Sequence, residues 1–379
     1  MIHRGTRALV IVCSSWSLLG GVCMPTIRSS PPALDDIELP EGFHISVFAE
    51  GVTNARAMCW GERGTLFVGS RAEGVVHALT DTDQDGRADI HRIIARDLRM
   101  PAGVAFRQGA LYVSAVDRIL RYDSIEDRLE NPPAPAVPPR LFPAEDHHGW
   151  KFIAFGPDDR LYVPVGAPCN NCLSADSLFA TITSMTADGK DLRIEAHGVR
   201  NSVGFDWRPG TGELWFTDNG RDWMGDDAPD CELDRLDARG RHFGYPYCHA
   251  GEVTDPEFGE QRPCSIFTAP AARLGAHVAP LGMRFLRSDA FPAKYRGAIL
   301  VAEHGSWNRS TPVGYRVVAA FPQPDGTART EAFADGWLKG NSAWGRPVDV
   351  LEAPDGSVLI SDDAADLIYR VWYTGTNIR

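Results

Sequence analysis

The chain has 379 residues, of which 44% are hydrophobic and 23% are charged, and its formal net charge at pH 7 is −12. This composition is typical of a globular protein with a full hydrophobic core. The acidic balance and the absence of a dense Lys/Arg run argue against binding to nucleic acid, because contact with a phosphate backbone requires clustered basic side chains.

The N-terminus predicts an export signal at residues 1–23. Basic residues at 3–7 precede an apolar run at 8–19, which is too short to be a permanent membrane anchor. We therefore expect a periplasmic or secreted protein with no membrane span. Cys23 also permits a lipoprotein anchor, but Val22 disfavours it because a small residue is normally needed there.

The remaining chain divides into a linker and one long domain. Residues 24–38 are rich in Pro and Ser and predict a linker. From residue 39 to 379, a polar turn followed by an alternating apolar strand recurs six times, at 64–68, 109–113, 159–163, 212–216, 297–301 and 356–360. Alternation with β-branched and aromatic residues is the strand signature, and six copies predict an all-β, six-bladed β-propeller. A β-sandwich is the alternative architecture. It is disfavoured because a sandwich would not need six copies of the repeat.

The cysteines suggest disulfide bonds. Six of them follow the expected signal, and an even number in an exported chain favours disulfides whose connectivity the sequence does not give. Cys169 and Cys172 are the most favoured pair, since zinc would require a second pair or suitably spaced histidines. Cys231, Cys248 and Cys264 fall in an expected insertion between the fourth and fifth copies.

An acidic loop follows the first copy of the repeat. Asp81, Asp83, Asp85 and Asp89 stand at alternate positions around Gly86, which resembles the first part of an EF-hand calcium loop. Arg92 occupies the place of the acidic residue that would complete the motif. A surface calcium site and a solvated acidic hairpin both remain open.

Two segments could carry chemistry. His147 and His148 stand in front of an alternating strand, and histidine is the commonest general base near neutral pH. Because adjacent side chains of an extended strand face opposite ways, only one of the two is expected to point into the propeller channel. Farther along, Arg200 and Asn201 lie between glycines and could bind a flat, carboxylated ligand, although a structural loop is the alternative.

The order of several short motifs resembles the glucose/sorbosone dehydrogenase family, which uses pyrroloquinoline quinone (PQQ) on a six-bladed propeller. The resemblance runs from about Leu39 to the C-terminus. The motifs are His148 ahead of Gly156-Pro157-Asp158, Leu161-Tyr162-Val163, Gly198-Val199-Arg200-Asn201, Thr217-Asp218-Asn219-Gly220, His242-Phe243-Gly244-Tyr245-Pro246, His277-Val278-Ala279-Pro280 and Gly345-Arg346-Pro347-Val348-Asp349-Val350. The element Cys169-Asn170-Asn171-Cys172 is more similar to the sorbosone dehydrogenase branch.

The resemblance implies a role for each matched residue. His148 would be the base that removes a hydroxyl proton from a sugar, while hydride passes to the quinone. The implied cofactor contacts are Arg200, Asn201, Arg346, His277, Lys151 in place of a family arginine, and Arg309 in place of a family lysine. The backbone carbonyls of Gly220 and Arg221 would hold a calcium ion against PQQ.

The expected function is PQQ-dependent oxidation of a sugar or aldose-type substrate, with electrons passing to an external acceptor. One alternative is a calcium-dependent propeller hydrolase such as a lactonase, for which the sequence offers no convincing set of inward carboxylates. The other is a propeller binding module that has lost the cofactor. No nucleophile elbow or dinucleotide fingerprint is present.

Overall fold

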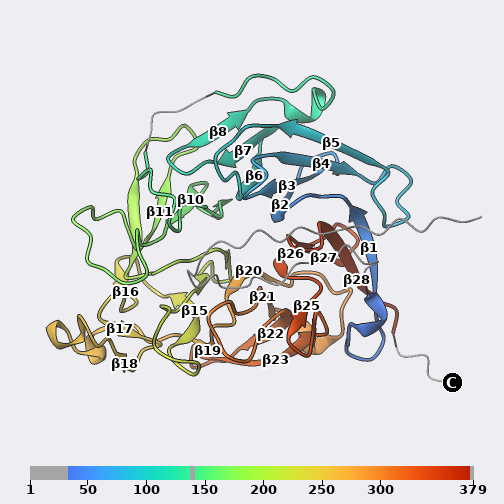
Figure 1. The fold of residues 1–379 in the computed structure, drawn as a ribbon. Coiled ribbons are helices and arrows are strands. Elements are labelled where there is room, and N and C mark those ends of the chain that lie inside the picture. The colour runs from blue at the N-terminus through green and yellow to red at the C-terminus, as the bar shows by residue number, and fades with distance from the viewer. Residues whose placement is uncertain (1–32, 137–140, 376–379) are drawn as a thin grey trace, which may run out of the picture.

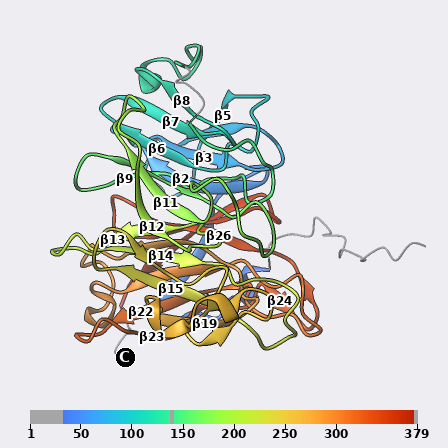
Figure 2. The same cartoon turned by 90° about the vertical axis from the view of Figure 1, so that its left-hand side faces the viewer.

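The computed structural model describes residues 33–136 and 141–375. The expected export signal, Cys23 included, lies outside the described residues, as does most of the expected linker. The described chain forms six β-sheets arranged as the blades of a propeller, which confirms the predicted fold (Figure 1). The blue-to-green blades and the yellow-to-red blades form opposite halves of the ring, as the turned view also shows (Figure 2).

The blades follow one another along the chain, and each repeat found in the sequence supplies a blade's second strand. Blade 1 comprises β2 (Ala55–Trp60), β3 (Leu66–Ser70), β4 (Val76–Thr80) and β5 (Ile90–Ala95), and blade 2 comprises β6 (Val104–Arg107), β7 (Ala110–Ser114) and β8 (Ile119–Tyr122). Blade 3 comprises β9 (Ala154–Phe155), β10 (Leu161–Val165), β11 (Thr181–Met185) and β12 (Arg193–His197), joined in parallel by β16 (Arg241–His242). Blade 4 comprises β13 (Phe205–Trp207), β14 (Leu214–Asp218), β15 (Asp230–Leu236) and β19 (Ala272–Ala276), and blade 5 comprises β20 (Pro280–Phe285), β21 (Ile299–Glu303), β22 (Arg316–Pro322) and β23 (Ala328–Ala334).

Blade 6 joins the two ends of the domain. It comprises β26 (Pro347–Glu352), β27 (Val358–Asp362), β28 (Leu367–Tyr373) and, as its outer strand, β1 (Phe43–Glu50) from the start of the domain. The antiparallel pairing runs from Phe43 opposite Tyr373 to Glu50 opposite Leu367. The ring is therefore closed by hydrogen bonds between the first and last strands of the propeller.

Among the described residues, six of the seven apolar clusters of the core each lie between two neighbouring blades, and the seventh contains Val203, Leu281 and Val348. In β3, Phe67 packs toward blade 2, whereas Leu66 and Val68 pack toward blade 6. In β14, Trp215 packs toward blade 5, whereas Leu214 and Phe216 pack toward blade 3. Because alternate side chains of a strand leave opposite faces, a blade with apolar residues on both faces is covered by its two neighbours.

The short elements connect or extend the blades. The 3₁₀ helices are η1 (Leu34–Asp36), η2 (Ile125–Asp127), η3 (Gly259–Gln261), η4 (Cys264–Ile266) and η5 (Ala293–Tyr295), and the remaining hairpins are β17–β18 (Cys248–His249, Val253–Thr254) and β24–β25 (Leu338–Lys339, Ser342–Ala343). The described end of the expected linker, residues 33–38, is packed against the propeller. Ile37 joins the cluster between blades 5 and 6, and Glu38 pairs with Asp335 through two backbone hydrogen bonds.

The expected insertion lies within blade 4, between β15 and β19. The Cys248–Cys264 disulfide closes a loop inside it, and the predicted Cys169–Cys172 disulfide is confirmed in the loop after β10. Cys59 and Cys231 are free thiols in β2 and β15, so not every cysteine of the even set is paired.

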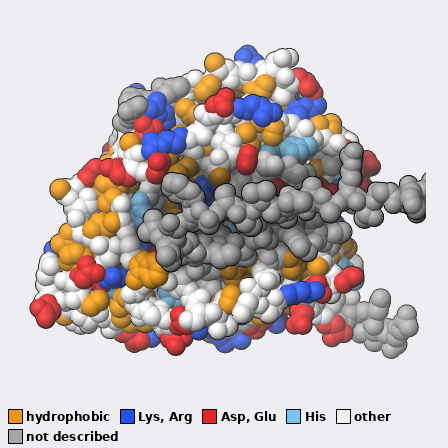
Figure 3. All heavy atoms as spheres, viewed as in Figure 1, with side chains coloured by type: hydrophobic (Ala, Val, Ile, Leu, Met, Phe, Trp, Pro, Cys, Tyr) orange, Lys and Arg blue, Asp and Glu red, His pale blue; other side chains and the backbone are white. Residues whose placement is uncertain are grey.

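Within residues 33–136 and 141–375, no helix is long and apolar enough to cross a membrane. On the face shown in Figure 3, basic and acidic side chains are interspersed, and no extended basic patch gathers among the coloured residues.

Candidate functional site

A cavity of about 610 Å³ lies where the six blades meet, and its volume is typical of a small-molecule site. Its lining comes from two equivalent places in the repeat: the approach to a blade's first strand, and the residues that follow its second strand. The first group contains Arg56, Met100, His148, Trp150, Arg200, Asn201, His277 and Arg346, and the second contains Arg71, Asn219, Gly220, Asp222, His304 and Trp307.

The cavity is positively charged although the whole protein is acidic. Four arginines line it, Arg56, Arg71, Arg200 and Arg346, against the carboxylates of Asp146 and Asp222. Asp146 is also paired with Arg99 at the surface. Clustered guanidinium groups favour an anionic ligand, and their planar forks suit carboxylates.

Several lining residues have strained backbone conformations. Met100, His148, His277 and Ala279 have φ values of +51°, +51°, +65° and +53°. Residues other than glycine rarely adopt this left-handed region, and such strain concentrates at active sites and ligand clamps.

His148 is held as a neutral base. Its side chain is buried, and Nδ1 lies 2.9 Å from the carbonyl oxygen of Ala167. A carbonyl only accepts hydrogen bonds, so Nδ1 carries the proton and Nε2 keeps its lone pair. Burial, followed by the charge of Arg200, holds the pKa of His148 well below its ordinary value. The imidazole is therefore neutral at physiological pH and can accept a proton at Nε2.

His147 also lines the cavity, which corrects the expectation that one of the two histidines points away. The expectation assumed an extended strand, but β9 begins only at Ala154 and His148 has a left-handed conformation. The turn brings the two imidazoles together, with ring centroids 4.1 Å apart.

Asp218 positions Arg200 and Asn201. This buried carboxylate ends β14 and accepts hydrogen bonds from the backbone N–H groups of Arg200 (2.7 Å) and Asn201 (2.6 Å). Burial raises the pKa of Asp218 to about 6. The Arg200 guanidinium donates to Asn170 in the Cys169–Cys172 loop, through Nε to the backbone oxygen and NH2 to Oδ1. The disulfide loop is thus part of the cavity wall.

Blade 6 repeats this arrangement. Asp362, which ends β27 as Asp218 ends β14, accepts a hydrogen bond from the backbone N–H of Arg346 at 2.9 Å. The Arg346 side chain donates from Nε to the carbonyl of His304 and from NH2 to that of Gly305. Neighbouring blades therefore hold the guanidinium in place.

A second, half-buried histidine contributes to the same wall. His304 Nε2 donates to Asp363 Oδ1 at 2.7 Å, and Arg56 donates to the other oxygen of that carboxylate at 2.8 Å. Burial and then the charge of Arg346 lower the pKa of His304 to about 4. Its neutral form joins Asp363 and Arg56 in a network beneath the cavity.

Two predicted cofactor contacts do not line the cavity. Lys151 is buried elsewhere, where Nζ donates to the carbonyl of Gly149 at 3.1 Å and burial lowers its pKa to about 8. Arg309 instead joins two loops through Asp226 and Asp227. The spacing of charges in the sequence could not distinguish these cations from Arg200 and Arg346.

Of the two residues expected to hold calcium through their carbonyl oxygens, one lines the cavity. Gly220 lines the cavity, whereas the Arg221 side chain turns away to Asp255 and Glu257. Among the described residues, no hydrogen bond ends on the carbonyl oxygen of Gly220 or Arg221.

Six residues of the lining were not predicted from the sequence: Arg56, Arg71, Trp150, Asp222, His304 and Trp307. A usable signal was nevertheless present in the repeat. Arg71, Asn219, His304 and Asp363 each follow the last residue of a second strand, in β3, β14, β21 and β27. Extending each of these four copies by three residues would have collected them.

The chain matches the model of the family described as "Domain of unknown function (DUF7133)" over residues 29–369. The chain belongs to this family. An uncharacterized protein of Borreliella burgdorferi is 33% identical over 361 residues, which cover 89% of this chain and 91% of that protein.

Solved structures share the architecture at lower identity. A Trichoderma reesei enzyme of carbohydrate-active family AA12, in a calcium structure, has a TM-score of 0.77 and 20% identity over 92% of this chain and 99% of its own. The holo PQQ domain of pyranose dehydrogenase from Coprinopsis cinerea has a TM-score of 0.74 and 18% identity over 89% and 97% of the two chains. The PQQ-bound aldose sugar dehydrogenase of Streptomyces coelicolor has a TM-score of 0.63 and 21% identity over 88% and 100%. At these identities the likeness demonstrates a shared fold.

Proposed function

We propose that the protein is a PQQ-dependent dehydrogenase that oxidises a sugar or aldose-type substrate in the cavity where the blades meet. The observation that carries the proposal is the cluster of four arginines in a protein of net charge −12. PQQ is a planar tricarboxylate, so its charge matches this lining. The PQQ bound to the pyranose and aldose sugar dehydrogenases of the same fold supports the assignment.

The residues present fit this cofactor. Arg200 and Arg346 would hold its carboxylates, together with Asn201 and His277, and Arg56 and Arg71 add positive charge. Trp150 Nε1 is buried and has no hydrogen-bond partner among the described residues, so it offers a further donor. The free carbonyl oxygens of Gly220 and Arg221 suit a calcium ion, a hard cation that binds oxygen ligands. Lys151 and Arg309 have no place in this set.

His148 would act on the substrate. Nε2 accepts the proton of the hydroxyl group on the carbon that is oxidised, while the Ala167 carbonyl keeps Nδ1 protonated and the ring oriented. PQQ supplies the acceptor for the hydride that leaves the same carbon. The product carries a carbonyl group, and an external acceptor then takes up the electrons. The Cys169–Cys172 loop favours a sorbosone-type substrate within this class.

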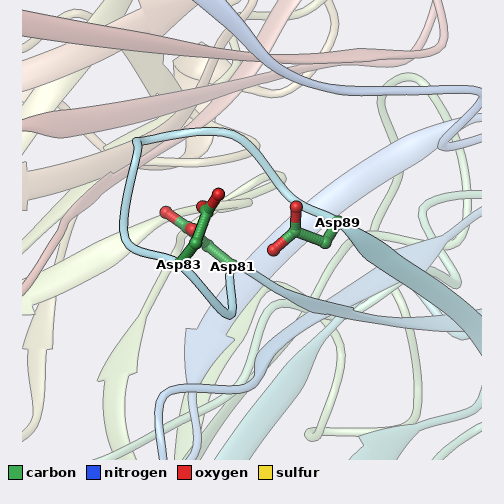
Figure 4. A group of neighbouring side chains, drawn as sticks. All are labelled: Asp81, Asp83 and Asp89. Carbon is green, nitrogen blue, oxygen red and sulfur yellow. The ribbon is translucent and has the colours of Figure 1, made fainter.

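The acidic loop between β4 and β5 is proposed as a separate calcium site. Carboxylate oxygens of Asp81, Asp83 and Asp89 lie within 4.8 Å of one another inside the curve of the loop (Figure 4). Asp81 Oδ1 is buried without a hydrogen-bond partner among the described residues. Asp85 is not in this group, and its Oδ1 accepts the backbone N–H of Arg87 at 2.8 Å.

Export is proposed for residues 1–23. The two disulfides support it, because disulfides persist mainly in oxidising compartments. A lactonase-like metal site is not favoured, since within the described chain no group of three potential metal ligands other than Asp81, Asp83 and Asp89 was found.

The test is a titration of the purified protein with PQQ and calcium, followed by a screen of sugars with an artificial dye as acceptor. We expect a quinone absorption change at saturation and dye reduction that requires both additions. His148→Ala should lower kcat by about 10²-fold or more and leave PQQ affinity unchanged. His147→Ala is the matched control and should retain most of the turnover.

Two results would contradict the proposal. Absence of any PQQ binding in the presence of calcium would favour a binding module without cofactor. Full turnover in His148→Ala would eliminate the assigned base.

A further inference from the structure

Two tryptophans stand exposed at the edge of the cavity. Trp223 and Trp307 are 66% and 58% exposed, whereas every other tryptophan in the described chain is buried or half-buried. Their rings touch edge to face, with centroids 5.4 Å apart and planes at 87°. Large exposed apolar side chains gathered in one place mark interaction sites.

The pair extends the cavity outward. Trp307 follows β21 and lines the cavity beside His277 and Arg346. Trp223 follows β14 and does not line the cavity, but it packs against Trp307. The two indoles therefore form a right-angled apolar corner that continues the cavity wall toward solvent.

The loops that carry the indoles are tied together. Arg309 donates from NH1 to the carbonyl of Asp226 and from NH2 to Asp227 Oδ1 at 2.9 Å, and the backbone N–H of Ser310 donates to Asp226 Oδ1 at 3.1 Å. His277 Nε2 donates to the Gly225 carbonyl at 2.7 Å. Trp223 itself has a φ of +70°, a conformation that bulky residues rarely adopt. The corner is held in position rather than formed by freely moving side chains.

The charges around the indoles select a neutral, hydroxylated ligand. Asp222, next to Trp223 in the chain, pairs with Arg200 at 3.3 Å, and Asp227 of the same loop pairs with Arg309 at 2.9 Å, so the charges on the loops that carry the indoles are balanced. A balanced surface of this kind does not favour an anion, and its carboxylates accept hydrogen bonds from hydroxyl groups. A sugar ring presents C–H groups to an aromatic face and hydroxyl groups at its edge, so it satisfies both features.

We propose that Trp223 and Trp307 form a subsite for a second sugar ring, next to the ring that is oxidised. The inference rests on the proposed function, because the subsite would give the proposed active site a preference for disaccharides and longer chains over monosaccharides. The corner is the specificity element, and Arg309 is its positioning residue.

The test measures sugar binding by the protein without cofactor, independently of oxidation. Titration calorimetry with glucose, cellobiose, maltose and maltotriose should give the oligosaccharides at least about tenfold lower Kd than glucose. Trp223→Ala should raise the oligosaccharide Kd about tenfold and leave the glucose Kd unchanged. Trp307→Ala, at the cavity wall, should raise the oligosaccharide Kd by a larger factor than the glucose Kd. Ile266→Ala, which removes another exposed apolar side chain, is the control, and circular dichroism checks the fold of every variant.

The outcomes separate this inference from the proposed function. Oligosaccharide binding that depends on the indoles, in a protein that does not bind PQQ, would support the subsite and remove the dehydrogenase assignment. Equal affinity of wild type and both tryptophan variants would overturn the subsite, even if PQQ binds and sugars are oxidised. Slower reduction of a protein electron acceptor with unchanged sugar affinity would also overturn it and make the indoles an acceptor-docking surface.

Discussion

His148 reaches the cavity through a left-handed turn rather than through the register of a strand. That conformation puts both His147 and His148 at the cavity, and the deeper burial of His148 distinguishes the proposed base from its exposed neighbour. The sequence singled out this pair because histidine is the usual neutral-pH base. The backbone angle that orients them is set by contacts of the folded chain.

At the same scale, His77 allows a test of how a buried histidine changes the stability of the protein with pH. It is fully buried in β4, where Nε2 donates to the carbonyl of Thr53 at 3.1 Å and Nδ1 lies 2.9 Å from His91 Nε2. A proton added at Nδ1 of His77 would place its N–H group directly against the N–H group of His91 Nε2, and two donors repel each other. Burial lowers the pKa of His77 to about 4.

The sign of the effect follows from this lowered pKa. Below pH 6.5 the unfolded chain takes up a proton that the folded protein does not accept until about pH 4. His77 therefore lowers stability as pH falls through this window, by about 3 kcal/mol. In urea unfolding, the stability advantage of wild type over His77→Gln should shrink by about that amount between pH 7 and pH 4. A constant difference would show that the burial of His77 does not control its proton.

At the scale of elements, the loop between β4 and β5 shows that the residues of one sequence motif do not all converge in the folded loop. The sequence places Asp81, Asp83, Asp85 and Asp89 in one pattern, whereas the folded loop gathers three of them and turns Asp85 toward the backbone of Arg87. Spacing predicts which residues share a loop. The folded conformation of the loop decides which carboxylate oxygens converge.

The loop yields a prediction with an internal control. Calcium at ten times its Kd should stabilise the protein by about 1.4 kcal/mol, seen as a higher Tm. Asp81→Asn and Asp83→Asn should remove this increase, since they neutralise two of the three clustered carboxylates. Asp85→Asn should retain it. If Asp85→Asn alone removes the response, the four-residue pattern of the sequence describes the site better than the three-residue group.

At the scale of the whole molecule, stability depends on the closure of the ring in blade 6. Phe43 in β1 packs edge to face against Phe291, Tyr295 and Phe333, with ring centroids 4.8, 5.5 and 5.2 Å away. These partners belong to blade 5 and its connections, while β1 pairs with β28 of blade 6. The start of the domain therefore binds the last two blades together.

Phe43→Ala should lower the free energy of unfolding by about 3–5 kcal/mol, as expected for loss of a buried aromatic ring. Chemical denaturation followed by circular dichroism measures the change, and Leu173→Ala, which removes an exposed side chain, is the control. A loss for Phe43→Ala no larger than that of Leu173→Ala would mean that the closure contributes little to stability.

The sequence by itself determined the architecture. Each blade is built from local alternation of apolar residues between polar turns, a pattern that can be read along the chain, so six repeats predicted six blades and placed His148 ahead of the third. The tertiary structure alone decided which cations share a cavity. Arg56 and Arg71 belong to blade 1, whereas Arg200 precedes blade 4 and Arg346 precedes blade 6. They converge because the ring brings equivalent ends of these blades together. Lys151 instead bonds to nearby Gly149, and Arg309 bonds to the loop of Asp226 and Asp227. Closure by β1 was likewise decided by the fold, since strand pairing between the two ends of a chain depends on the geometry of the completed ring.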